Sequence, residues 1–207
     1  MYRKRHIRVA IFLLIGIIMS SWVMFYHRIP GDQAILELVE SMSSNSLDTP
    51  MEIGRNLGGV WVNLGALILI VTAFAWKKCF RTGLIFLGVI PASMGIYILK
   101  YLIDRPRPNA DHISFVEAST TGSFPSGHAY QTILLAILTV GLVLPLVPYR
   151  VIRILIGLLI LCLVGSVALS SIYLGFHWPS DILGSFIFAF PSAALLIRLG
   201  RSIKIND

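Results

Sequence analysis

The 207-residue chain is 56% hydrophobic and only 13% charged, and its formal net charge is +7 at neutral pH. A soluble domain carries about 25% charged residues, so this composition excludes an ordinary globular domain and indicates a membrane protein. Because the basic residues cluster at the ends of apolar runs, membrane orientation explains the positive charge better than nucleic-acid binding does. The two cysteines, Cys79 and Cys162, are too few for a disulfide framework and are expected to be free thiols.

The first apolar run, Ile7–Tyr26, follows the basic stretch MYRKRH. A secretory signal peptide begins in the same way. However, the run is long enough to cross a bilayer, and the FYHRIP stretch at its end offers no small-residue cleavage site. We therefore expect a retained first span.

The segment from Arg28 to Leu57 is too polar to cross a membrane. Within it, the stretch DQAILELVESM has apolar residues at helical spacing, which predicts a helix lying along the outer interface or capping the bundle. Such a helix could act as a packed cap or as a gate for a lipid that enters sideways, and the sequence leaves both interpretations open.

Five further apolar runs have the length of a membrane span, namely Gly58–Trp76, Leu84–Ile103, Ala129–Val147, Val151–Tyr173 and Ile182–Leu199. With the first run they predict an all-α fold, a polytopic membrane protein with a six-transmembrane-helix bundle and an interfacial helical segment between spans 1 and 2. The sequence contains no low-complexity tract, internal repeat or appended soluble domain. We therefore expect a single membrane-embedded domain over residues 1–207.

Six spans sort the basic residues onto two sides of the membrane. One side receives the larger set, Arg3, Lys4, Arg5, Arg8, Lys77, Lys78, Arg81, Arg150, Arg153, Arg198, Arg201 and Lys204. The other side receives Arg28, Arg55, Lys100, Arg105 and Arg107. The more basic side is expected to be cytoplasmic, which places both termini inside and residues 123–130, SFPSGHAY, on the periplasmic or extracellular face.

Three segments on the predicted outer face carry nearly all of the unusual polar residues. They are KYLIDRPRPNADH (100–112), GSFPSGHAY (122–130) and YLGFHWPSDILG (173–184). A six-helix bundle brings span ends on the same face together, so we expect these three segments to meet.

The first two segments supply groups that bind anions. Lys100, Arg105 and Arg107 are fixed positive charges, and a guanidinium presents a donor fork that suits phosphate oxygens. Ser126 and Gly127 lie at an expected helix start, where backbone N–H groups favour an anion and a glycine lets the backbone approach a ligand closely.

The histidines supply the chemistry, because His128 and His177 can exchange protons near neutral pH. Asp181 lies about one turn after His177, in a helix entered near Pro179, so its carboxylate can fix the tautomer of the His177 ring and leave the other nitrogen free to attack. These groups predict a phosphate pocket with a nucleophile and an acid. The neighbouring Lys and Arg side chains would repel a cation, so we expect neither a metal nor another cofactor.

Each of these features has a simpler explanation by itself. Lys100 could extend to the interface, PSGH could be a turn with a helix start, and HWPSD could be an interfacial tryptophan with a capped helix. All of these explanations would have to hold together on one face, which favours a shared site.

The pattern resembles the type 2 phosphatidic acid phosphatase superfamily, which also includes vanadium-dependent haloperoxidases. The first motif of that family is Lys, six residues and Arg-Pro, and it is matched here by Lys100, Arg107 and Pro108. The second motif, Pro-Ser-Gly-His, is matched by residues 125–128. The resemblance covers a core of about residues 84–184, and six spans fit the membrane branch of the family.

The third family motif is Ser-Arg, five residues, His, three residues and Asp, and its spacing is matched by Ser170, His177 and Asp181. One position departs, because Ser171 stands where the family has an arginine that contacts the phosphate. Such a charge-assisted contact is worth about 1.5–3 kcal/mol. Its loss is compatible with weaker catalysis, another headgroup, replacement by Arg105 or a non-catalytic member, whereas the retained histidines and aspartate favour an active enzyme.

The resemblance implies metal-independent hydrolysis of a lipid phosphate or lipid diphosphate. His177 would attack phosphorus to form a phosphohistidine, Asp181 would orient its ring, and His128 would act as general acid and then general base. The phosphate oxygens would be held by Lys100, Arg107, Ser126 and Gly127, with Arg105 and Ser171 as further candidates.

Bacterial members of the family act on undecaprenyl diphosphate, phosphatidylglycerol phosphate, phosphatidic acid and lipid A, and nothing in the sequence chooses among them. The short termini and compact loops are typical of a protein of the bacterial inner (plasma) membrane. The alternatives are a lipid phosphotransferase, a non-catalytic lipid-phosphate binder or transporter marked by Ser171, and a purely structural bundle. No sequence feature specifies an oligomeric state.

Overall fold

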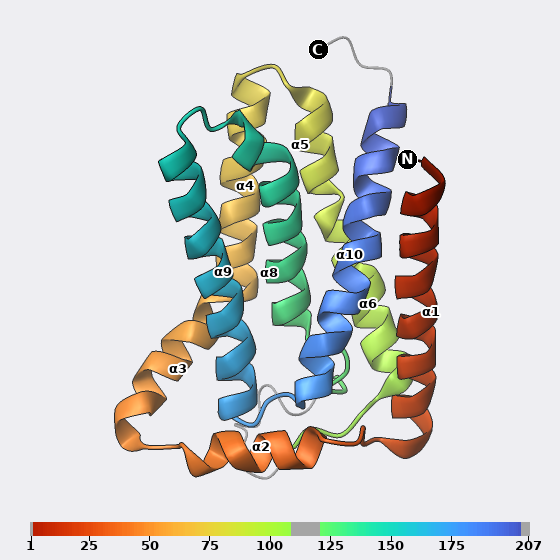
Figure 1. The fold of residues 1–207 in the computed structure, drawn as a ribbon, viewed down its shortest axis with the longest axis vertical. Coiled ribbons are helices and arrows are strands. Elements are labelled where there is room, and N and C mark those ends of the chain that lie inside the picture. Colours follow the sequence, from red (N-terminus) through yellow and green to blue (C-terminus); the bar gives the residue numbers. More distant parts are fainter. Residues whose placement is uncertain (1, 109–120, 204–207) are drawn as a thin grey trace.

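The computed structural model describes residues 2–108 and 121–203, except for the side chains of residues 2–5. Within these ranges every regular element is helical (Figure 1). Some residues named above lie outside the described part of the chain, namely Asn109–His112 of the first polar segment, Lys204 and the side chains of Arg3, Lys4 and Arg5.

The helices in chain order are α1 (Tyr2–Tyr26), α2 (Asp32–Ser41), α3 (Asn45–Leu57), α4 (Val60–Trp76), α5 (Phe80–Leu87), α6 (Val89–Ile103), α8 (Gly127–Leu138), α9 (Arg150–Tyr173) and α10 (Pro179–Ser202). A π-helical turn, η1 (Thr139–Val143), and a 3-10 turn, η2 (Leu144–Leu146), extend α8.

Five helical stretches in the described residues are long and apolar enough to cross a membrane, namely His6–Tyr26, Phe80–Ile103, Gly127–Leu146, Arg150–Tyr173 and Pro179–Ser202. Helices α3 and α4 are bent by 45° at their junction and bring the total to six if they form one crossing. The structure thus confirms the predicted all-α polytopic membrane protein. The span expected at Gly58–Trp76 is a helix of 17 residues, α4, preceded by α3, so the expected interfacial segment divides into α2 and α3.

Helix α8 runs through the middle of the bundle (Figure 1). Tyr130, Ile133, Leu134 and Leu138 are buried on it, and it packs against α4, α6, α9 and α10. In contrast, α9 turns leucines such as Leu159 outward, as expected of a helix that faces lipid rather than water. The central, fully packed position of α8 fixes the location of its N-terminal turn, where the PSGH motif lies.

The bundle has two distinct ends (Figure 1). The start of α1, the end of α10, the α4–α5 junction and the start of α9 lie at one end, so Lys77, Lys78 and Arg150 share it. The ends of α6 and α9 and the starts of α8 and α10 lie at the opposite end, together with α2. The described parts of all three polar segments are therefore carried to the end of the bundle opposite the start of α1 and the end of α10.

Helix α2 lies across that opposite end and packs against α9 and α10 (Figure 1). Gly31 precedes it with a φ of +93°, a left-handed conformation that glycine adopts without strain and that lets the chain turn from α1 onto the end of the bundle. Leu36 of α2 is buried whereas Leu38 is exposed, so the helix is amphipathic and has an inner face. The amphipathic segment is thus packed as a cap.

Candidate active site

Direct hydrogen bonds join the three polar segments beneath α2. Lys100 Nζ lies 3.5 Å from the carbonyl oxygen of Ser123, Trp178 Nε1 donates to the carbonyl of Pro106 at 2.9 Å, and Ser126 N donates to the carbonyl of Asp181 at 3.3 Å. Each segment is therefore bonded to both of the others. Residues separated by up to about 80 positions in the sequence form one constellation at one end of the bundle.

His177 lies in the short connection between α9 and α10. Gly175 adopts a left-handed conformation just after α9, with φ of +70°, and the backbone N–H groups of Phe176 and His177 both donate to the carbonyl of Ser171 at 3.1 Å. Pro179 then starts α10, where the missing N–H of a proline costs nothing. The connection is held at both ends, so the His177 side chain has a defined position.

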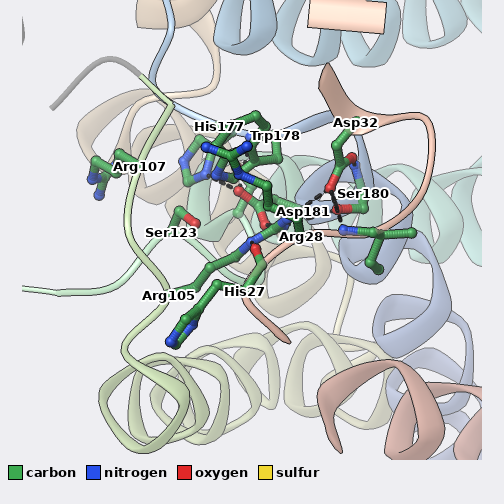
Figure 2. A network of polar contacts seen from close by, with 12 residues as sticks. His27, Arg28, Asp32, Arg105, Arg107, Ser123, His177, Trp178, Ser180 and Asp181 are labelled. Carbon is green, nitrogen blue, oxygen red and sulfur yellow. Dashed lines mark hydrogen bonds and ion pairs between the residues drawn. The ribbon is translucent and has the colours of Figure 1, made fainter. Parts of the chain in front are cut away.

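The imidazole of His177 pairs with the carboxylate of Asp181. Nδ1 of His177 lies 3.3 Å from Oδ2 of Asp181, and the same oxygen accepts a hydrogen bond from the backbone N–H of Trp178 at 2.9 Å (Figure 2). His177 is 3% exposed and Asp181 is fully buried. With Nδ1–H donating to the carboxylate, the lone pair resides on Nε2, the nitrogen that could attack a substrate.

The surroundings of His177 favour its neutral form. Burial lowers the pKa of the His177 imidazole to about 3, and the positive charges of Lys100 and Arg107 act in the same direction, whereas Asp181 opposes them. The ring is therefore neutral at physiological pH and retains a nucleophilic nitrogen.

Lys100 and Arg107 supply the positive charge of the site. Lys100 lies in the last turn of α6, and it is 3% exposed. Arg107 is half-buried, and its Nη1 donates to the carbonyl of Phe176 at 2.9 Å. Arg107 is thus bonded to the connection that carries His177, whereas Lys100 is bonded to the segment before α8.

Ser126, Gly127 and His128 form the start of α8. The hydroxyl of Ser126 caps the helix by accepting a hydrogen bond from Ala129 N at 3.4 Å, and its carbonyl accepts a bond from Ser185 Oγ of α10 at 2.9 Å. His128 is half-buried. The first turn of a helix presents N–H groups that the helix itself does not use, so this end can bind an anion.

Arg105 differs from the prediction of a phosphate contact. Its guanidinium is 1% exposed, and all three of its nitrogens donate to protein acceptors: Nε to the carbonyl of His27 at 2.7 Å, Nη2 to Asp32 at 2.6 Å, and Nη1 to Ser180 Oγ at 2.8 Å and to Asp181 Oδ1. Figure 2 draws Arg105 within this network and Arg107 apart from it. Arg105 therefore lies behind Asp181, and each of its three nitrogens is bonded to protein.

Ser171 also differs from its predicted role as a phosphate ligand. Its side chain is buried, and its hydroxyl donates to the carbonyl of Val167 in the preceding turn of α9 at 2.6 Å. Its own carbonyl accepts the backbone N–H groups of Phe176 and His177. Ser171 thus helps to anchor the nucleophile's connection, and the hydroxyl that replaces the motif arginine is bonded within α9.

Asp32 and Ser180 are site neighbours that the sequence reasoning missed. Asp32 is 3% exposed on α2 and bonds both Arg105 and Ser180. The only signal for Asp32 in the sequence is an acidic residue at the start of an amphipathic helix, which normally serves the local helix N-terminus. Its buried partners, Arg105 and Ser180, become evident only when α2 is packed onto α10 in the structure.

Two cavities lie near the site. A polar cavity of about 290 Å³ is lined by residues that include Arg28, Arg107, Trp178 and, from α2, Gln33. A more apolar cavity of about 240 Å³ lies among α4, α6 and α8 and includes Tyr97. In residues 2–108 and 121–203, no group of three or more His, Cys, Asp or Glu side chains is placed to hold a metal ion.

Comparisons with known proteins identify the family. The structure described as the first transmembrane PAP2 type phosphatidylglycerolphosphate phosphatase from Bacillus subtilis is similar to this chain, with a TM-score of 0.76 and 23% identity over 95% of this chain and 97% of that one. Aquifex aeolicus LpxE has a TM-score of 0.60 and 16% identity over 84% of this chain and 98% of that one. No curated protein matches. The family model of the PAP2 superfamily matches residues 81–203, a range that contains all three motifs, and the chain therefore belongs to the PAP2 superfamily.

Proposed function

We propose that this protein hydrolyses a lipid phosphate or lipid diphosphate without a metal, with His177 as the nucleophile. The observation that carries the proposal is the buried, neutral imidazole of His177, bonded through Nδ1 to Asp181 and flanked by the charges of Lys100 and Arg107. An oriented nucleophile beside fixed cations suits attack on an anionic phosphorus centre.

In the first step, Nε2 of His177 attacks phosphorus, and the bond from phosphorus to the lipid oxygen breaks. His128 donates a proton to that oxygen as it leaves. The ring of the resulting phosphohistidine carries positive charge, which the carboxylate of Asp181 stabilises. The lipid product departs as an alcohol from a monophosphate, or as a monophosphate from a diphosphate.

In the second step, a water molecule attacks the phosphorus of the phosphohistidine. His128, now neutral, accepts a proton from this water, the N–P bond breaks, and inorganic phosphate is released. The electron pair of the N–P bond returns to Nε2, so His177 recovers its neutral form. The cycle consumes one water molecule and requires no redox group or metal.

The non-bridging oxygens need donors that are already in position as negative charge redistributes. Lys100 of α6, Arg107 of the segment after α6 and the N–H groups at the start of α8 would fill this role. Arg107 is bonded to Phe176, next to His177, and Lys100 and Ser126 are bonded to the neighbouring motif segments. Preorganised donors of this kind typically supply the largest part of the rate enhancement.

A lipid substrate fits the surroundings of the site. The apolar cavity among α4, α6 and α8 includes Tyr97, and the hydroxyl of Tyr97 lies beside Gly127. A lipid tail in this cavity would bring its headgroup to the start of α8. Because basic residues such as Lys77, Lys78 and Arg150 lie at the other end of the bundle, we place the site on the periplasmic or extracellular face of a bacterial inner membrane.

Ser171 gives a reason to test a second candidate function, namely a lipid-phosphate binder or transporter without turnover. The hydroxyl at this position bonds within α9, so no arginine supports the phosphate from there. A binder would retain a lipid phosphate in the pocket without releasing inorganic phosphate.

The deciding experiment measures phosphate release from a panel of lipid mono- and diphosphates by the purified protein in detergent micelles. His177→Gln should reduce the rate by at least about 10³-fold, as expected for loss of a nucleophile. The matched control is His6→Gln, the same change at the opposite end of the bundle, which should leave the rate unchanged. Undiminished release by His177→Gln would overturn the assigned nucleophile.

The same preparation distinguishes hydrolysis from its alternatives. A substrate carrying ³²P in the transferred phosphoryl group should give an acid-labile label on the wild-type protein and none on His177→Gln. Label that moves to an added acceptor lipid would instead identify a phosphotransferase. Retention of intact lipid phosphate without any release would identify a binder.

A further inference from the structure

Asp32 reaches the site from a part of the chain that contains none of the family motifs, outside the matched residues 81–203. It begins α2, and its carboxylate is 3% exposed. A buried carboxylate is costly unless it is paired and hydrogen-bonded. Its two oxygens must therefore be accounted for by specific partners. One partner is local, the backbone N–H of Ile29, which donates to Oδ2 at 3.2 Å, and the others lie in the catalytic constellation (Figure 2).

One oxygen of Asp32 caps the helix that carries Asp181. Oδ1 accepts a hydrogen bond from the backbone N–H of Ser180 at 2.9 Å. Ser180 is the second residue of α10, so its N–H is one of those that α10 cannot satisfy by itself. A carboxylate at this end of a helix is also stabilised by the helix dipole. Asp32 thus fixes the first turn of α10 from another helix.

The other oxygen of Asp32 binds Ser180 and Arg105, and Arg105 in turn binds Asp181. Oδ2 accepts from Ser180 Oγ at 2.6 Å and forms an ion pair with Arg105 Nη2 at 2.6 Å. Nη1 of Arg105 in turn donates to Oδ1 of Asp181. Because Arg105 holds Oδ1, the other oxygen of Asp181 is turned toward His177, whose Nδ1 it faces at 3.3 Å.

The net charge of the Asp32, Arg105 and Asp181 side chains also supports a role of Asp32 in catalysis. Asp181 alone with Arg105 would form a neutral pair, and the guanidinium would oppose the positive charge that develops on the His177 ring. Asp32 compensates Arg105, so the three ionised groups keep a net negative charge behind the ring. Negative charge placed there in advance stabilises the phosphorylated imidazole.

We propose that Asp32 is a positioning residue of this active site, acting through Arg105 and Ser180 on the carboxylate of Asp181. The inference rests on the proposed function, in which His177 is the nucleophile. It adds α2 to the catalytic apparatus, since Asp32 ties the cap on the end of the bundle to the carboxylate behind the nucleophile.

The test is Asp32→Asn in the purified full-length protein. The amide keeps the shape of the side chain but removes its charge and one acceptor. We expect kcat for phosphate release to fall by about 10- to 100-fold, by analogy with other residues that act through a ligand or catalytic group. KM should stay within about twofold, because Asp32 does not contact the substrate.

Asp48→Asn is the matched control. Asp48 is also a carboxylate on the interfacial segment, and its Oδ1 accepts a hydrogen bond from Tyr173 Oη near the end of α9 at 2.8 Å. Because it is not bonded to Arg105 or to α10, the control should keep wild-type kcat. Equal losses in Asp32→Asn and Asp48→Asn would overturn the inference, because they would indicate a general effect on the packing of the segment.

A double-mutant cycle separates positioning from a merely structural role. If Asp32 acts through Asp181, then Asp32→Asn should change kcat by less than about threefold in an Asp181→Asn background. Losses that multiply in the double variant would overturn the inference. Ser180→Ala is the milder second variant, should Asp32→Asn not fold. It removes one link of the same network and should lower kcat by a few-fold, and wild-type kcat for Ser180→Ala would overturn the inference as well.

These outcomes are separable from failure of the proposed function. A large loss in His177→Gln together with wild-type kcat in Asp32→Asn overturns the positioning role alone, whereas an active His177→Gln overturns the nucleophile. The ring-¹⁵N signals of His177 give a readout that needs no turnover. Asp32→Asn should shift them by altering the bond from Nδ1 to Asp181, and unchanged signals would overturn the inference.

Discussion

Arg107 Nη1 donates a hydrogen bond of 2.9 Å to the backbone carbonyl of Phe176, the residue immediately before His177. A residue of the first family motif is therefore hydrogen-bonded to the α9–α10 connection, which carries the proposed nucleophile. A guanidinium has five N–H donors in a planar fork, so one arm can hold this carbonyl while others face a phosphate. In the proposed reaction Arg107 thus has two tasks, and an ammonium group, which lacks the planar fork, would perform them less well together.

Arg107→Lys should therefore lower kcat/KM by roughly 10- to 100-fold although the charge is retained, because the fork is lost. The rate of phosphate release by the purified protein at several substrate concentrations measures kcat/KM. Arg153→Lys is a matched control, since Arg153 also donates to a backbone carbonyl, that of Val147 at 2.9 Å, at the opposite end of the bundle. Wild-type activity in Arg107→Lys would contradict the two tasks.

The loss of folding stability at acidic pH should depend in part on His177. Its pKa in the folded protein is about 3, below the usual value of about 6.5 for the unfolded chain. The unfolded chain thus binds a proton below about pH 6.5 that the folded protein binds only near pH 3, so stability falls as the pH drops through this window and is unaffected above it. Thermal unfolding in detergent at several pH values should show a steeper decline for wild type than for His177→Gln. Identical slopes would contradict the neutral, buried ring.

Two glycines near the site should respond differently to alanine. A Cβ at Gly127 would lie 3.5 Å from Tyr97 Oη, an ordinary contact, so Gly127→Ala should fold normally but lose activity if a phosphate approaches this backbone. A Cβ at Gly122 would lie 2.6 Å from the backbone nitrogen of Arg105, so Gly122→Ala must displace the backbone and should lower the melting temperature. Melting temperatures and phosphate release check both. Full activity in Gly127→Ala would contradict close approach of the substrate to Gly127.

Removal of divalent metals should leave activity unchanged, because the proposed reaction places the negative charge against Lys100, Arg107 and helix N–H groups. Phosphate release after extensive EDTA treatment measures this directly. Vanadate should inhibit, because it adopts the five-coordinate geometry of phosphorus in the transition state. Loss of activity with EDTA that Mg²⁺ or Zn²⁺ restores would contradict the proposed mechanism.

Restoring the family arginine should not improve this protein. Ser171 is buried, so Ser171→Arg inserts a long charged side chain where only a hydroxyl fits, and overpacking typically costs about 1–3 kcal/mol. We expect a lower melting temperature and lower kcat. Ser171→Ala, which removes only the bond to Val167, should remain close to wild type. Higher kcat in Ser171→Arg would instead indicate a site weakened by loss of the arginine.

Much of the fold could be predicted because its signals are local. A run of about 20 apolar residues can satisfy its backbone in a bilayer only as a helix, so the spans follow from composition and length. Two span boundaries differ from the prediction. The predicted start of the third span, Leu84, moves to Phe80, and the second crossing is preceded by α3, because helical structure continues past the end of the apolar run.

By itself, the sequence determined the spans and the family motifs, and it predicted the pairing of His177 with Asp181, because a helix entered at Pro179 places Asp181 in its first turn, close to the connection that carries His177. Only the tertiary structure decided between the two arginines of RPRP. Their chemistry is identical, and packing alone turns Arg105 inward to Asp32 and Asp181 and leaves Arg107 beside His177. Partner choice among buried charges depends on which helices touch, and no local pattern in a sequence encodes that contact.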